Sequence, residues 1–512
     1  MRDTAERTRV RRRRQTEAAP VREVNYRDLK NPFPVMNAVS EDELEAVHIA
    51  ALSVLEDLGV KVLLPEAREL FASAGALVDP DTEMVRIGRD IVEGALLSAP
   101  KSFRLRAGVP ERDLHMELGR LIFQPGAGCP HATDLVRGRR PGTDVDFREL
   151  VTLTQAFDAL HMVPPLVEPQ NVAPNVRHYF TLEAQLTLSD KLPFIFSRGK
   201  PQVAESFEML KLYRGLSEDE FHAASHCYTI INTNSPRQID VPMAQGLIDF
   251  ARSGQVSIVT PFTLMGAMAP ITVAGAMTLS HAEAMAAIVL TQAAKPGAPV
   301  CYGTFTSNVD MKSGAPAFGT PEHFRASLLS GQLARRIGLP WRCASGSAAA
   351  VSDVQAAHET QFGLWGCLLA GATVVIHSAG WLEGGLTISY EKLITDMEAV
   401  QMVADLCAPT EAGDAAIGLD ALAEVQPGGH FFAAGQTMKR YQTEFYEPLN
   451  ADWSNYGTWV ERGRVEATER ATGQWQRILT DAVPPPADPA RVASLQEFIA
   501  RRTEAGGAPP ES

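Results

Sequence analysis

Eight short apolar runs in the middle of the chain limit the possible fold more than any other feature. They begin 30 to 42 residues apart, and segments with helical periodicity, such as "DFRELVTLTQAFDAL", lie between them. Buried strands that alternate with helices are typical of parallel βαβ units, and eight such units favour a closed barrel over an open sheet. The expected strands are 120–126, 162–169, 192–199, 226–236, 256–266, 298–308, 339–347 and 372–381.

The predicted fold is therefore α/β, a (β/α)8 TIM barrel with an N-terminal helical cap and a C-terminal helical extension. Ser40 and Glu43 form a capping-box pattern ahead of an apolar helical stripe, which predicts the first helix of the cap. No GxGxxG motif follows a predicted strand, which counts against a nucleotide-binding sheet. We expect five regions: a disordered basic tail (1–24), a helical cap with a small hairpin (25–115), the barrel (116–408), a loop-and-helix extension packed on the barrel (409–482), and a linker with a short helix and a disordered end (483–512).

Charge and cysteine usage narrow the class of partner. The formal net charge of -14 argues against nucleic acid and against an anionic membrane surface. The exception, "RTRVRRRRQ" near the start, is expected to be a frayed tail, with a nucleic-acid arm or a targeting peptide as the alternative. No uninterrupted apolar run approaches the ~18 residues of a membrane span. Six cysteines without a CxxC pair predict reduced thiols in a cytoplasmic enzyme.

The candidate site consists of side chains at the carboxyl ends of the predicted strands, because barrel enzymes bind their ligands there. Aromatic rings at four strand ends either pack in the core or form a cage for a cation. Arg198 suits either a substrate carboxylate or an ion pair with Glu168, and His377 is either a hydrogen-bonded barrel histidine or a donor at the entrance. The binding candidates are Phe262, Tyr302, Phe305, Trp381, Arg198, Asn232, Ser345 and Ser347, and the catalytic candidates are His377 and Glu383.

No metal site is expected from these residues. His226 and Cys227 are adjacent, so in a strand they point to opposite faces and cannot share a metal. Cys301 and Cys343 fall in neighbouring predicted strands, where a zinc site with His377 is the alternative. Small buried thiols that fill the barrel are the favoured interpretation.

Three stretches carry a family resemblance: "SDVQAAHETQFGLWGCLLAGATVVIHSAGWLEGGLTISYEKLITDMEAV" (352–400), "GGHFFAAGQTMKRYQTEFYEP" (428–448) and "DELEAVHIAALSVLEDLGVKV" in the cap. The chain resembles the trimethylamine methyltransferase family from about residue 25 to residue 480, with the motifs in the same order. The trimethylamine-specific members of that family carry pyrrolysine. This sequence has only standard residues, so it is similar to the branch that demethylates quaternary amines such as glycine betaine.

The resemblance implies a barrel methyltransferase that passes a methyl group from a quaternary amine to the Co(I) corrinoid (cobalamin) of a separate corrinoid protein. It implies no permanently bound cofactor and more than one subunit, a homo-oligomer. In that reaction a neutral tertiary amine leaves without a general acid, so the enzyme positions the donor and excludes water. Arg198, or the turn with Ser345 and Ser347, would then bind a betaine carboxylate.

Two other functions remain as alternatives. A corrinoid-independent barrel hydrolase or lyase would use His377 and Glu383 as acid and base, and would show a bell-shaped pH dependence. A non-catalytic methylamine-binding protein would bind its ligand without transferring a methyl group under any reductant. Methyl transfer that depends on reduced cobalamin separates both from the methyltransferase.

Overall fold

The computed structural model describes residues 24–511, so the basic run that was predicted to be a tail lies outside the described residues. The chain divides into two compact units. The larger unit contains Tyr26–Cys407 and Pro448–Ser512. The smaller unit contains Ala408–Glu447 together with the described residues before Tyr26. The region from 409 to 482, which was expected to be one extension, is therefore divided after Glu447.

The eight predicted strands are confirmed, although the structure makes each of them shorter than its apolar run. Most of them pair in parallel in the order β12, β14, β16, β19, β20 and β7, and β10 pairs in parallel with β11. A parallel bridge between Phe194 and Tyr228 joins β11 to β12. The bounds are β7 (Arg120–Phe123), β10 (Met162–Val163), β11 (Leu192–Pro193), β12 (Tyr228–Ile231), β14 (Val256–Val259), β16 (Val300–Gly303), β19 (Trp341–Ala344) and β20 (Val374–Ile376).

No ladder joins β7 to β10 within the described residues. The backbone N–H of His161 nevertheless donates to the carbonyl of Phe123 at the end of β7, at 2.9 Å. The arrangement is an α/β fold in which a helix separates each of the eight core strands from the next one along the chain.

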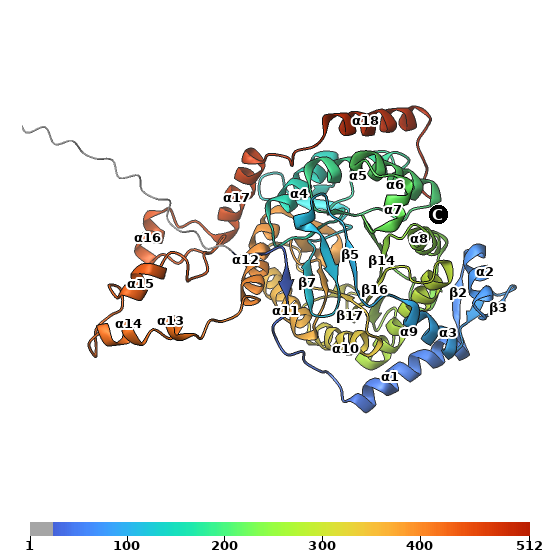
Figure 1. The fold of residues 1–512 in the computed structure, drawn as a ribbon, viewed down its shortest axis with the longest axis horizontal. Coiled ribbons are helices and arrows are strands. Elements are labelled where there is room, and N and C mark those ends of the chain that lie inside the picture. The colour runs from blue at the N-terminus through green and yellow to red at the C-terminus, as the bar shows by residue number, and fades with distance from the viewer. Residues whose placement is uncertain (1–23, 512) are drawn as a thin grey trace, which may run out of the picture. The chain divides into compact units, whose positions relative to one another are not determined.

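Helices surround the strands of the larger unit, as Figure 1 shows. Short polar caps begin several of them; Thr143 and Asp146, for example, form a capping box at the start of α4. The helices that follow the eight strands are α4 (Asp144–Ala156), α5 (Arg177–Leu188), α6 (Lys200–Arg214), α8 (Val241–Arg252), α9 (Val273–Ala294), α10 (Pro321–Ile337), α11 (Val354–Ala370) and α12 (Tyr390–Leu406), with a short α7 (Glu218–Ala223) after α6.

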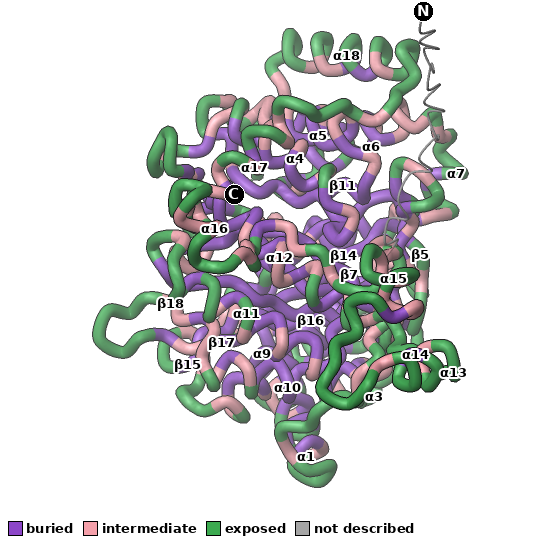
Figure 2. The backbone as a smooth tube through the Cα atoms, turned by 90° about the vertical axis from the view of Figure 1, so that its left-hand side faces the viewer, coloured by how far each residue is buried: buried purple, intermediate pink, exposed green. Residues whose placement is uncertain are grey.

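Helix α9 is the one described helix that is long and apolar enough to cross a membrane by length and composition. Of its most apolar window, 78% is buried inside the structure. A helix that is apolar on all sides is expected where other elements cover it on all sides, and Figure 2 shows α9 among the buried elements, with β14 and β16. Packing therefore accounts for the composition of α9.

The N-terminal region combines helices with a small sheet. The predicted capping box is confirmed: the Ser40 backbone N–H donates to the Glu43 carboxylate at 2.9 Å, at the start of α1. The expected hairpin is also present, formed by β3 and β4. The elements are β1 (Leu29–Lys30), α1 (Glu41–Ser53), a π-helical turn (Val54–Leu58), β2 (Val60–Val62), α2 (Pro65–Ser73), β3 (Leu77–Asp79), β4 (Met84–Arg86), α3 (Arg89–Ser98), β5 (Phe103–Leu105) and β6 (Leu114–Met116). A later strand, β13 (Gln238–Ile239), pairs with β2 and ties this region to the strand core.

Additional short strands extend the loops that follow the core strands. Two small sheets form in this way, one with the order β15-β17-β18 and one with the order β21-β22-β8-β9. The bounds are β8 (His131–Thr133), β9 (Arg140–Pro141), β15 (Phe262–Met265), β17 (Phe305–Val309), β18 (Pro316–Ala317), β21 (Trp381–Leu382) and β22 (Thr387–Ser389), with a 3-10 turn (Glu383–Gly385) between the last two.

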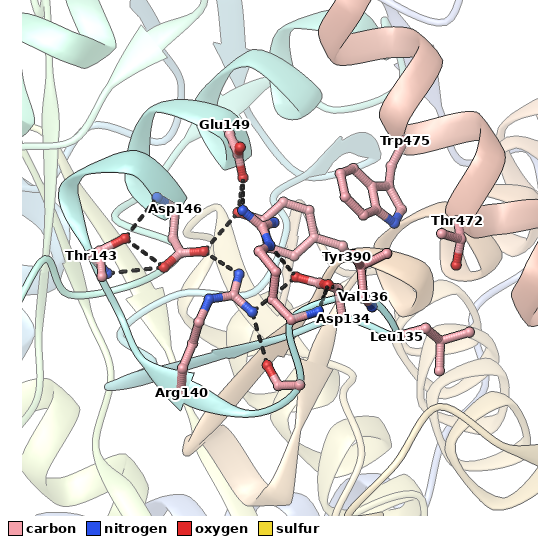
Figure 3. Close-up of polar contacts among 12 residues, drawn as sticks. Asp134, Leu135, Val136, Arg140, Thr143, Asp146, Glu149, Tyr390, Thr472 and Trp475 are labelled. Atoms are coloured by element: carbon pink, nitrogen blue, oxygen red, sulfur yellow. Dashed lines mark hydrogen bonds and ion pairs between the residues drawn. The ribbon is translucent and has the colours of Figure 1, made fainter.

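A polar cluster connects β9, α4 and α12 (Figure 3). The Tyr390 hydroxyl donates to Glu149 at 2.6 Å and lies 3.1 Å from a carboxylate oxygen of Asp146. Arg140 pairs with Asp146 and lies 2.9 Å from Asp134. Because these groups form hydrogen bonds and ion pairs with one another, burying the charges at the start of α4 costs little free energy.

The end of the chain packs against the rest of the larger unit. Trp475 on α17 donates its indole N–H to Glu391 on α12 at 2.9 Å, so α17 packs on the strand-containing unit. The final residues were expected to be disordered, but the Ala508 backbone N–H donates to the Asn175 carbonyl at 2.9 Å. The elements here are α16 (Tyr456–Glu461), α17 (Ala467–Asp481) and α18 (Pro489–Glu504).

The smaller unit contains three short helices, α13 (Asp414–Ile417), α14 (Leu419–Glu424) and α15 (Gly435–Arg440). The Gln436 side-chain amide donates to the carbonyl of Ala415 at 2.8 Å, which ties α15 to α13.

Candidate functional site

The site lies in the loops that follow the core strands, as the fold class leads one to expect. After β14 the chain turns and continues as β15, and after β16 it continues as β17. These two strands pair in parallel with Phe262 opposite Phe305. The register brings two of the predicted cage residues together, with their ring centroids 5.0 Å apart.

A cavity of about 470 Å³ opens among these loops, a volume in the range of small-molecule sites. Aromatic rings dominate its walls, and no aspartate or glutamate from the described part of the chain lines it. Weak negative potential over the ring faces attracts cations. The rings are those of Phe194, Phe196, Phe262, Phe305 and Trp381, with the imidazole of His377 beside them.

His377 and Trp381 form the stacked part of the wall, with centroids 4.4 Å apart and planes within 17°. His377 has a positive φ of 55°, which turns the chain sharply at the end of β20. Burial, together with the charge of Arg342, holds the pKa of His377 well below the usual imidazole value. The ring is therefore neutral near pH 7 and does not serve as a general acid there.

Two glycines fix the indole of Trp381. A Cβ atom on Gly346 would lie 2.8 Å from Cζ3 of the indole, and one on Gly385 would lie 2.6 Å from Cζ2. Both glycines also have positive φ, 111° and 106°, which other residues rarely adopt. Gly385, in the glycine-rich turn of the family motif, and Gly346, which precedes that motif, thus make room for the ring.

Arg342 reaches the cavity from β19 and is almost fully buried, at 1% exposure. Its guanidinium lies 4.7 Å from the ring centroid of Phe305, and Nη1 donates to the Thr304 carbonyl at 2.8 Å. Burial lowers the pKa of Arg342 to about 9, so the group is still charged at neutral pH. The cavity therefore combines aromatic walls with one buried positive charge.

Arg198 and Asn232 line the cavity, as predicted. Arg198 lies at the exposed side, where it donates to Glu168 at 3.1 Å and stacks over Phe196 at 5.1 Å. Of the two roles considered for Arg198, the structure contains the ion pair. Glu168 also pairs with Arg177, so two arginines share its charge.

Three predicted binding residues point away from the cavity. The Tyr302 ring is fully buried and its hydroxyl meets His281 at 3.0 Å, on helix α9. The Ser345 hydroxyl donates to the His377 carbonyl at 3.1 Å, and the Ser347 hydroxyl donates to Glu359 at 2.6 Å. These serines hold the backbone behind the site, and Tyr302 packs between a strand and a helix.

Glu383 is also placed differently from the expectation. Arg139 donates to both of its carboxylate oxygens, at 2.9 Å each, and Thr387 donates at 3.0 Å. The hydrogen bonds from Arg139 and Thr387 outweigh burial and keep the pKa of Glu383 below its usual range. Glu383 does not line the cavity. The structure therefore does not bring His377 and Glu383 together as an acid–base pair.

No group of three His, Cys, Asp or Glu side chains within residues 24–511 is placed to hold a metal ion. All six cysteines are free thiols, and burial raises the pKa of Cys129, Cys227 and Cys301. Cys301 and Cys343 are buried among the core strands, in line with the favoured interpretation.

An aromatic cavity at the carboxyl ends of parallel strands is the site of a small-molecule enzyme of the α/β class. The family model described as trimethylamine methyltransferase (MTTB) matches residues 5–507 of the chain. The chain belongs to the trimethylamine methyltransferase family, and it is an enzyme that transfers methyl groups.

Individual relatives agree with this assignment. A glycine betaine methyltransferase of Desulfitobacterium hafniense (strain Y51) is 33% identical over 472 residues, covering 92% of this chain and 98% of the relative. A trimethylamine methyltransferase MttB of Desulfitobacterium hafniense (strain DSM 10664 / DCB-2) is 30% identical over 469 residues, covering 91% and 93%. The solved monomethylamine methyltransferase (MtmB) of Methanosarcina barkeri covers 89% of this chain and 97% of its own, with a TM-score of 0.45 and 10% identity, too distant a likeness to bear on fold or function.

Sequence reasoning missed two parts of the wall. Phe194 and Phe196 lie in the run "LPFIFSRG", where the alternation of the two phenylalanines was the available signal. Arg342 lies inside the apolar run "LPWRCASGS", and a charge within a buried strand is itself unusual.

Proposed function

We propose that this enzyme transfers a methyl group from a quaternary amine of the glycine betaine type to the Co(I) corrinoid of a partner protein. The observation that carries the proposal is the aromatic cavity, whose histidine is held neutral. Ring faces suit a quaternary ammonium group, which cannot donate a hydrogen bond. The similarity to a glycine betaine methyltransferase over 92% of the chain supports the same donor class.

The chemistry needs no proton transfer from the protein. The donor methyl carbon accepts an electron pair from the corrinoid, which is the methyl acceptor and so a substrate. The C–N bond breaks, its electrons stay on nitrogen, and a neutral tertiary amine leaves. Phe262, Phe305 and Trp381 would hold the ammonium and orient one methyl group, which is catalysis by positioning. A neutral His377 fits this reaction, because an acid is not required.

The acid–base alternative has less support. It needs His377 and Glu383 to act on one ligand, whereas Glu383 is bound by Arg139 and lies outside the cavity lining. The binding-protein alternative does not explain the assignment to a family of methyltransferases.

We infer further that the eight core strands form a closed (β/α)8 barrel. Pairing of β20 with β7 and of β10 with β11 supports this, as does the hydrogen bond from His161 to Phe123 where β7 and β10 adjoin. We also expect a cytoplasmic enzyme with more than one subunit, since all six cysteines are free thiols and the resemblance implies an oligomer.

The test is an anaerobic methyl-transfer assay. The protein is mixed with cob(I)alamin, or with a corrinoid protein, and with a panel of quaternary and tertiary amines, and methylation of the corrinoid is followed by absorbance. We expect a change that depends on a quaternary donor. No change with any donor, with free and with protein-bound corrinoid, would refute the proposal.

A variant tests the cage directly. Replacing Phe262 and Phe305 together by leucine keeps the apolar volume but removes two ring faces. With about 0.5–2 kcal/mol for each of the two cation–π contacts, kcat/KM should fall about 5- to 900-fold. The control is Tyr456→Leu, an exposed ring on α16 that does not line the cavity. Equal activity in the double variant and the control would exclude the cage.

A further inference from the structure

Arg342 is a buried cation without an anionic partner. Within the described residues its single side-chain hydrogen bond runs from Nη1 to the Thr304 carbonyl. Its Nε is buried with no partner, although the side chain lines the cavity. Buried polar groups are nearly always hydrogen-bonded, so an unpartnered guanidinium at a cavity wall points to a ligand that supplies the acceptor.

The other buried cations of the chain show how unusual this is. Arg112 lies 2.9 Å from an aspartate carboxylate, and Lys392 lies 2.8 Å from Asp396. Lys191 donates to two backbone carbonyls, at 2.5 and 2.6 Å. Arg112 and Lys392 thus have anionic partners, and Lys191 has two strong acceptors, as a buried charge normally requires. Among the charged residues described as buried, Arg342 is the cation left with one neutral acceptor.

The charge of the cavity wall points in the same direction. Arg342 and Arg198 both line the cavity, and no acidic residue of residues 24–511 lines it with them. Arg198 already has an anionic partner in Glu168, at 3.1 Å, although Glu168 also pairs with Arg177. A ligand that carried only a positive charge would therefore meet the uncompensated charge of Arg342. A ligand with a carboxylate as well would neutralise it.

The rings for the ammonium lie next to this arginine. The guanidinium carbon is 4.7 Å from the centroid of Phe305, whose own centroid is 5.0 Å from Phe262 and 5.9 Å from Trp381. One small zwitterion can thus place its carboxylate at the guanidinium and its ammonium among the rings. Arginine suits this role because its planar fork binds carboxylates with two hydrogen bonds.

We propose that Arg342 binds the carboxylate of a zwitterionic methyl donor and so selects betaines over quaternary amines that lack a carboxylate. The inference rests on the proposed function for its donor class. It assigns to Arg342 the carboxylate contact that the sequence suggested for Arg198 or the turn with Ser345 and Ser347.

The experiment measures donor binding to the full-length protein by isothermal titration calorimetry, without corrinoid. The probes are glycine betaine and choline, which share the trimethylammonium group and differ in the carboxylate. We expect the wild type to bind glycine betaine at least about 30-fold more tightly than choline, the effect of one buried charge-assisted pair. Omitting the corrinoid excludes an anionic group of the methyl acceptor as the source of the effect.

Variants assign the preference to the residue. Arg342→Met should reduce the preference to within about 3-fold, and Arg342→Lys should give an intermediate value, because it keeps the charge without the fork. The matched control is Arg325→Met, an exposed arginine on α10, which should bind as the wild type does. The melting temperature of Arg342→Met should be unchanged or higher, because the substitution removes an unpaired buried charge. If that variant does not fold, a reduced preference in Arg342→Lys still assigns the carboxylate contact to this residue, and an undiminished one overturns the inference.

Each outcome is informative. Equal binding of the two probes by the wild type, no binding of either, or an undiminished preference in Arg342→Met would overturn the inference. Equal methyl transfer from donors with and without a carboxylate would support the proposed function but contradict the role of Arg342. Tighter binding of the donor with a carboxylate, but no methyl transfer to any corrinoid, would support the role of Arg342 and contradict the proposed function.

Discussion

The packing of Trp381 against Gly346 makes the sharpest prediction. A Cβ atom on Gly346 would lie 2.8 Å from Cζ3 of the indole, closer than real Cβ atoms come to a neighbour. The indole cannot move aside easily, because Gly385 lies against its opposite edge and His377 stacks on it. Gly346→Ala should therefore destabilise the fold and displace the ring from the cavity wall.

The expected cost has two parts. The φ of 111° at Gly346 is strained for alanine, which costs about 1–3 kcal/mol. Overpacking against the indole costs about 1–3 kcal/mol more. The free energy of unfolding should fall by about 2–6 kcal/mol in the wild-type background. In a Trp381→Leu background the overpacking part disappears and only the backbone strain remains.

The assay is a double-mutant cycle by urea denaturation, with donor binding measured on the same four proteins. The cycle should give a coupling of about 1–3 kcal/mol between positions 346 and 381, as expected for residues in direct contact. Additive costs would refute the reasoning, because Gly346 would then be required for backbone conformation alone. Tight donor binding by Gly346→Ala would refute the claim that the ring forms part of the site.

Two pH predictions concern buried titratable groups. Burial raises the pKa of Asp249 above the usual range of an aspartate to about 6, although Gln245 donates to one of its oxygens at 2.8 Å. Its contribution to stability is thus present below the unfolded pKa and is lost as pH rises through about 6. After a discount for partial exposure, the free energy of unfolding should fall by about 1–2 kcal/mol between pH 5 and pH 7.5 because of this group. Urea denaturation at the two pH values should show a smaller fall in Asp249→Asn than in the wild type. An equal fall in the two proteins would contradict the prediction. His161 accepts from the Phe123 backbone N–H and contacts the Tyr26 carbonyl, at 2.9 Å each, and burial lowers its pKa to about 4. Its contribution is present above pH 6.5 and is lost as pH falls toward 4, by about 2 kcal/mol between pH 6.5 and pH 5. In the same assay, the free energy of unfolding of His161→Asn should fall less between pH 6.5 and pH 5 than that of the wild type. An equal fall would show that other groups cause it.

The sequence by itself determined where the strands and helices of the core lie along the chain. Strand and helix signals depend on residues that are near one another in the chain, so the eight core strands and the capping box at Ser40 were predictable. It also placed Phe262, Phe305 and Trp381 at strand ends, where the structure finds them in one cavity. The family motifs further identified the class of enzyme, because the resemblance extends along most of the chain.

Only the tertiary structure decided where the side chains point and what they meet. Strands buried on both faces are apolar throughout, so they lack the alternation that tells the inner face from the outer. Tyr302 was therefore expected at the mouth, yet it points toward α9 and meets His281. Partners distant in sequence decided the rest: Glu168 pairs with Arg198, and no carboxylate of the described residues reaches Arg342. The charge that is left free depends on the folded arrangement of several strands, and no single stretch of the sequence contains that information.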